Sequence, residues 1–127
     1  MITVDEYLGQ HLAGHESELT DEIRANAEII CGRANQLIAE FGEDRGLRSG
    51  WRPAAVNHAA GRATRSRHMS GQAIDVEDDD GLLDAFCRQN IGLLEHLELW
   101  LEDGAATPSW AHIQCVPPRS GRRFFIP

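Results

Sequence analysis

Apolar residues recur at helical spacing in the first third of the chain. Between residues 20 and 42 the apolar positions are Ile23, Ala27, Ile30, Ala34, Leu37, Ile38 and Phe41. These steps of three and four give one apolar face, which predicts a long amphipathic helix that begins at Thr20 and ends at Gly42. A shorter helix is expected from Thr3 to about His11, because Glu6 stands three residues after Thr3 and completes a capping box. Gly14 separates the two helices.

From Leu47 onward the pattern changes to short runs bounded by turn residues. These runs predict strands at 47–52, 73–76, 100–102 and 111–116, with a last edge strand at 122–126. Residues 82–99 predict one helix, or two helices broken near Gly92, and residues 57–67 and 103–109 predict loops. The expected fold is α+β, with a small antiparallel sheet packed against N-terminal helices and one central helix. We expect a single domain over 1–127, helical in 1–46 and carrying a zinc site on the sheet in 47–127.

Length and composition fit a globular domain. The chain has 127 residues, of which 42% are hydrophobic and 25% charged, so its core needs no disulfides. Cys31, Cys87 and Cys115 are odd in number and widely spaced, which predicts reduced thiols and neither a disulfide nor a cysteine metal site. We expect a monomer.

Charge and hydropathy exclude two classes of partner. The net charge of −8 argues against a nucleic-acid partner, since a phosphate backbone attracts Lys and Arg. No apolar run approaches a membrane span, and the first residues do not resemble a secretory signal. Basic residues gather at 45–67 and 119–123, either as a cationic cleft for an anionic peptide or as chance clustering on a solvated surface.

The segment from Ser66 to Asp75 carries the candidate chemistry. His68 and Asp75 are seven residues apart and can meet if the chain turns at Gly71, which tolerates unusual backbone angles. His112, at the start of another predicted strand, supplies a third ligand. Two imidazoles and one carboxylate suit Zn²⁺, with water in the fourth position.

The motif Ser-x-His-x-x-Gly-x-Ala-x-Asp over 66–75, followed by Trp-x-His at 110–112, resembles the zinc D-Ala-D-Ala peptidases. These include VanX and VanY types and phage L-alanyl-D-glutamate endolysins, which share their metal site with the Hedgehog signalling domain. Upstream, Ser-Gly-Trp-Arg-Pro at 49–53 is similar to the family's Ser-Gly-Tyr-Arg segment, and Asn57 follows it as in many members. The whole chain looks most like short phage and prophage members.

The resemblance implies roles for individual residues. His68, Asp75 and His112 are implied as zinc ligands. Arg52 is implied as the cation that stabilises the oxyanion of the reaction, and Ser66 as a contact to the substrate, a peptidoglycan stem peptide. An enzyme of this kind, made in the cytoplasm without a signal, would reach the wall through a lysis pore or on a phage particle.

One position departs from the family pattern. Better-known members carry Glu or Asp three residues before the last histidine as general base, and here that position is Ser109. A serine hydroxyl cannot accept this proton at neutral pH, so another carboxylate is needed. Glu102 is our first candidate, because the seven-residue loop from Asp103 to Ser109 can fold back towards the metal. Asp103 and Glu77 are the alternatives.

Two functions are consistent with these residues. The first is a zinc peptidase that cuts a stem-peptide bond, as an endopeptidase or a D-Ala-D-Ala carboxypeptidase. The second is a catalytically inactive zinc-binding relative with a structural or wall-binding role. Arg52 favours the first and Ser109 favours the second.

Overall fold

The computed structural model describes residues 1–61 and 66–127. The elements in chain order are α1 (Val4–Gly9), the 3-10 helix η1 (Glu16–Glu18), α2 (Asp21–Phe41), β1 (Leu47–Ser49), α3 (Ala54–Ala59), β2 (Ala73–Glu77), α4 (Leu82–Gln89), α5 (Ile91–Leu97), β3 (Trp100–Glu102), β4 (Trp110–Gln114) and β5 (Phe124–Phe125). Helices and a five-stranded sheet confirm the predicted α+β class.

The two N-terminal helices begin where their caps predicted. The Thr3 hydroxyl accepts a hydrogen bond from the backbone N–H of Glu6, and the Glu6 carboxylate accepts one from the backbone N–H of Thr3, so the capping box is complete. The Thr20 side chain caps α2, and Gly42 ends it with φ 88°, a left-handed conformation that favours glycine. The short helix η1 between them was not predicted.

The sheet is mixed. Its strand order is β1-β2-β4-β3-β5, and the first three pairs are antiparallel, as expected. The prediction of a wholly antiparallel sheet is wrong at one edge, where β5 pairs with β3 in parallel. The long connection after β4 brings the chain back in the direction of β3 before it pairs.

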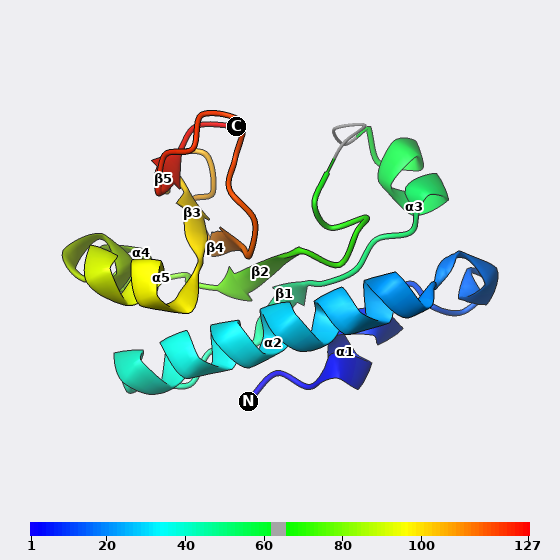
Figure 1. Ribbon diagram of the computed structural model, residues 1–127, viewed down its shortest axis with the longest axis horizontal. Helices are drawn as coiled ribbons and strands as arrows, with labels where there is room; N and C mark the ends of the chain where they lie inside the picture. The colour runs from blue at the N-terminus through cyan, green and yellow to red at the C-terminus, as the bar shows by residue number, and fades with distance from the viewer. Residues whose placement is uncertain (62–65) are drawn as a thin grey trace.

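Helix α2 runs along one side of the sheet with α1 beside it, while α4 and α5 lie at one end of the molecule and α3 at the other (Figure 1). The core cluster joins the inner faces of α1, α2, α4 and α5 to the sheet residues Ile74, Val76, Ala111 and Ile113. All three cysteines are free, and Cys31 and Cys87 are buried among these apolar side chains. Within the described residues, no helix is long and apolar enough to cross a bilayer.

Two local predictions are corrected. Residues 57–59 belong to α3 and not to a loop, and Asn57 is buried at 1% exposure; residues 62–65 of that predicted loop lie outside the described residues. The strand expected over 47–52 ends at Ser49, because the backbone beyond it bonds to the α1 region rather than to a strand: the Trp51 N–H donates to the Tyr7 carbonyl at 3.0 Å. The break in 82–99 falls at Asn90.

Candidate metal centre and cleft

Asp75 and His112 face each other across the centre of the sheet. Strands β2 and β4 pair so that these two residues are directly opposite. Their neighbours Ile74 and Ile113 are fully buried in the core, so alternation turns Asp75 and His112 to the other face of the sheet. The Nδ1 atom of His112 lies 2.9 Å from Oδ1 of Asp75.

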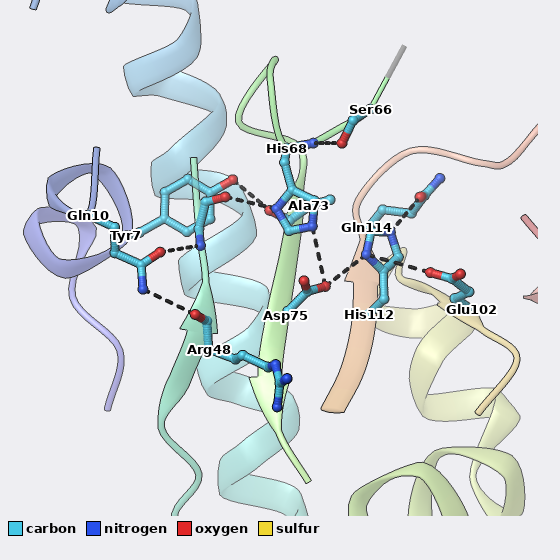
Figure 2. Close-up of polar contacts among 11 residues, drawn as sticks. Tyr7, Gln10, Arg48, Ser66, His68, Ala73, Asp75, Glu102, His112 and Gln114 are labelled. Atoms are coloured by element: carbon cyan, nitrogen blue, oxygen red, sulfur yellow. Dashed lines mark hydrogen bonds and ion pairs between the residues drawn. The ribbon is translucent and has the colours of Figure 1, made fainter. Parts of the chain in front are cut away.

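His68 reaches the same point from the loop before β2. Its Nδ1 lies 2.8 Å from the carbonyl oxygen of Gly50, which can only accept, so Nδ1 carries the proton. The other ring nitrogen, Nε2, lies 3.3 Å from Oδ1 of Asp75. His68 is 1% exposed, and no described residue makes a hydrogen bond to its Nε2. A buried nitrogen with its lone pair turned towards a carboxylate and a second imidazole is suited to binding a metal (Figure 2).

The three side chains form a compact donor set. One ligand atom from each of His68, Asp75 and His112 lies within 4.8 Å of the other two. In residues 1–61 and 66–127, no other three His, Cys, Asp or Glu side chains meet in this way. Two imidazole nitrogens and one carboxylate oxygen are the donors that zinc and similar transition metals take, so the residues present fit such an ion.

Burial and close contact separate the pKa values of the three groups. Burial alone would raise the pKa of Asp75, but the hydrogen bond from His112 and the close approach of both histidines outweigh it and hold that pKa well below its usual range. Burial lowers the pKa of His68, and Asp75 offsets this only in part. Burial also lowers the pKa of His112. At this residue, however, the hydrogen bond to Asp75 and the nearby charges of Asp75 and Glu102 outweigh burial, and the pKa is raised. Without metal, His112 is therefore the imidazole that holds a second proton more readily.

Glu102, the first candidate for the general base, lies beside this group at the end of β3. Its Oε2 is 3.8 Å from Nδ1 of His112, and its side chain is 14% exposed. Burial raises its pKa, the His112 charge lowers it in part, and Asp75 adds to the rise. A carboxylate whose pKa is raised is a stronger base than one in open water.

The two alternative acids are engaged elsewhere. Asp103 lines a separate hollow, and one of its carboxylate oxygens lies 3.8 Å from Nη2 of Arg88. Glu77 lies 3.8 Å from Nη1 of Arg48 and is 41% exposed. Of the three candidates, Glu102 is the one that lines the cleft over the candidate metal ligands.

This cleft has a volume of about 340 Å³, and Arg52 and Ser66 line it together with the three candidate ligands and Glu102. Arg52 is 8% exposed, and its backbone N–H donates to the carbonyl of His68 at 3.2 Å, which ties the two segments together. The Ser66 hydroxyl accepts from the backbone N–H of His68 at 3.2 Å. Ser109 is not among the described residues that line the cleft; its carbonyl accepts from the Asp78 N–H.

The model of one protein family, peptidase M15, matches residues 6–92 of this chain, which is more than half of its length. The chain belongs to the peptidase M15 family. The matched stretch contains His68 and Asp75 and ends before His112 and Glu102, so those two are placed by the geometry of the sheet alone. No curated protein and no solved structure gives a significant match.

The structure also places residues in this M15 site that the sequence did not single out. Gln114 is two positions after His112 on the same face of β4, and its Oε1 lies 3.2 Å from Nε2 of His112. Strand alternation was a signal that could have found it. The role of the Gly50 carbonyl had no sequence signal, because it depends on how α1 meets β1.

Proposed function

We propose that this protein is a zinc-dependent peptidase that hydrolyses a peptide bond in the stem peptides of bacterial peptidoglycan. The observation that carries the proposal is the position of Glu102, a largely buried carboxylate with a raised pKa, 3.8 Å from Nδ1 of His112 in a group of three residues that could hold a metal ion. Membership of the M15 family supports a metallopeptidase.

His68 Nε2, an Asp75 oxygen and His112 Nδ1 would hold the zinc ion. When bound, zinc supplies Lewis acidity and lowers the pKa of a water molecule to about 7. Glu102 accepts a proton from the attacking water and passes it to the nitrogen of the leaving amine as the C–N bond breaks. Arg52 lines the same cleft, and its guanidinium stabilises the negative charge that develops on the carbonyl oxygen.

The substrate class rests on the resemblance of the 66–75 motif to wall peptidases and on the charge of the cleft. Arg52 and Arg67 both line it, and stem peptides carry carboxylates that such cations attract. Ser66 offers a hydroxyl at the same wall of the cleft. On the same resemblance we extend the proposal to a phage endolysin or a virion-associated wall hydrolase.

The experiment is to incubate zinc-loaded protein with purified peptidoglycan and to identify the released fragments by mass spectrometry. We expect fragments with new amino and carboxyl ends at one stem-peptide bond, whose masses identify that bond. The matched control is Glu102→Gln, which should keep zinc and release almost nothing. If the zinc-loaded parent releases no fragment from any wall type, the peptidase proposal is wrong and a non-catalytic wall-binding role takes its place.

A further inference from the structure

The side chain of Gln114 connects the metal centre to the end of β4. Gln114 is 4% exposed, and its side chain makes two hydrogen bonds. Its Oε1 lies 3.2 Å from Nε2 of His112, and its Nε2 donates to the carbonyl of Val116 at 2.9 Å. Figure 2 shows the amide beside the imidazole, on the side of the ring away from Asp75.

The Val116 carbonyl fixes the orientation of this amide. A carbonyl oxygen can only accept, so the NH₂ group of Gln114 must point towards Val116. The amide oxygen is then the atom that faces His112, and it can also only accept. Nε2 of His112 must therefore carry a proton, and a neutral His112 has its lone pair on Nδ1, the nitrogen that faces Asp75 at 2.9 Å.

We infer that Gln114 is a positioning residue that holds His112 as the Nε2–H tautomer and so presents Nδ1 to the metal. The inference rests on the proposed function only in taking zinc as the ion. His68 is held in the opposite sense: its Nδ1–H donates to the Gly50 carbonyl at 2.8 Å, which leaves Nε2 for the metal. The two imidazoles thus bind through different nitrogens, each selected by an acceptor on its other nitrogen.

The direct test uses the unmodified protein. Long-range ¹H–¹⁵N correlation spectra of the zinc-loaded chain identify which nitrogen of each histidine is protonated. We expect the proton on Nε2 in His112 and on Nδ1 in His68. A proton on Nδ1 of His112, with zinc at Nε2, overturns the inference, and this result does not depend on whether any variant folds.

Two variants at one position measure the contribution of the acceptor. Gln114→Met removes the acceptor at similar length, and we expect zinc affinity, measured by competition with a chromophoric chelator, to fall roughly 10–100-fold. Gln114→Glu keeps an acceptor oxygen and should bind zinc much more tightly than Gln114→Met. The matched control is Gln72→Met, since Gln72 accepts from the Ser70 hydroxyl and lies outside the cleft. Parent-like zinc affinity in Gln114→Met overturns the inference.

A substrate contact would give a different pattern, because Gln114 also lines the cleft. If Gln114→Met changed KM at saturating zinc and left zinc affinity unchanged, the residue would act on substrate and the inference would be wrong. The proposed function fails separately. A parent chain that takes up zinc with the expected tautomers but cleaves no wall retains this inference and loses the peptidase proposal.

Discussion

The two histidines of the candidate metal centre are held in place by different means. His68 is almost fully buried, and its ring is oriented by a main-chain carbonyl, that of Gly50. His112 is oriented by side chains, Asp75 on one nitrogen and Gln114 on the other, with Glu102 at 3.8 Å. The first arrangement depends on the path of the backbone, and the second on side chains that can be exchanged singly without moving a strand.

The backbone that orients His68 is itself fixed by α1. The peptide group between Gly50 and Trp51 donates its N–H to the Tyr7 carbonyl and accepts the His68 Nδ1–H at its own carbonyl. The Gln10 side chain accepts from the Gly50 N–H and donates to the Arg48 carbonyl, as a neighbouring strand would (Figure 2). The main chain around Gly50 therefore supports His68 rigidly. On the His112 side, which also holds the candidate base Glu102, single side chains orient the imidazole and set its pKa.

The largest expected effect comes from removing the rigidly held ligand. His68→Ala should abolish tight zinc binding and, with it, all hydrolysis, because two remaining protein ligands cannot hold the ion. The loss should exceed the roughly 10–100-fold that an outer partner such as Gln114 contributes. Elemental analysis and chelator competition measure it, with His96→Ala, an exposed histidine on α5, as control. Tight zinc binding by His68→Ala would show that this residue is not a ligand.

On the His112 side, Glu102→Gln should separate metal binding from catalysis. The substitution keeps size and polarity but removes the base, so wall hydrolysis should fall by roughly 10²–10⁴-fold while zinc content stays that of the parent. Glu77→Gln and Asp103→Asn are matched controls and should remain active, since neither residue lines the cleft. Full activity in Glu102→Gln together with loss in one control would move the role to that control residue.

Local signals account for most of what the sequence predicted. The start and end of α2 follow from Thr20, the apolar spacing and Gly42, all of which act within one helix. The turn at Gly71, with φ 76°, was also readable from the sequence, because few other residues adopt that conformation. The alternation in β2 and β4 put Asp75 and His112 on the face away from the core.

Features that depend on distant contacts were missed. The parallel pairing of β5 with β3 depends on the path of the chain after β4, which no local pattern specifies. Helix α3 begins directly after Pro53, and its last three residues, 57–59, fall in a stretch whose small and polar composition predicts a loop. The Gly50 carbonyl acquires its role only because Tyr7, 43 positions earlier in the printed chain, approaches it in space.

Gly50→Ala tests the main-chain support of His68 without changing a candidate metal ligand. A Cβ at this position would lie 2.3 Å from the Tyr7 carbonyl oxygen, so backbone would have to move. We expect a loss of about 1–3 kcal/mol in the free energy of unfolding, as for other overpacked sites, together with weaker zinc binding because the acceptor for His68 shifts. Gly92→Ala is the control: nothing lies within 4 Å of its Cβ, and alanine in a helix should stabilise by about 0.5–1 kcal/mol. Denaturant unfolding of the metal-free proteins measures the change in stability of both variants.

The smallest expected effect is the release of a single proton on zinc binding, and it distinguishes His112 from His68 directly. In the metal-free protein the pKa of His112 is raised above its usual 6.5 and that of His68 is lowered below it. At a pH between these two pKa values, His112 is mostly charged and His68 mostly neutral, and only His112 must lose a proton to bind zinc. We expect release of about one proton per zinc from the two histidines at that pH. The His112 contribution should fall as pH rises through the folded-state pKa of His112. Calorimetry at fixed pH in buffers of different ionisation enthalpy counts these protons. Release of two protons at a pH between the two pKa values, or of none, would contradict the unequal protonation of the two imidazoles.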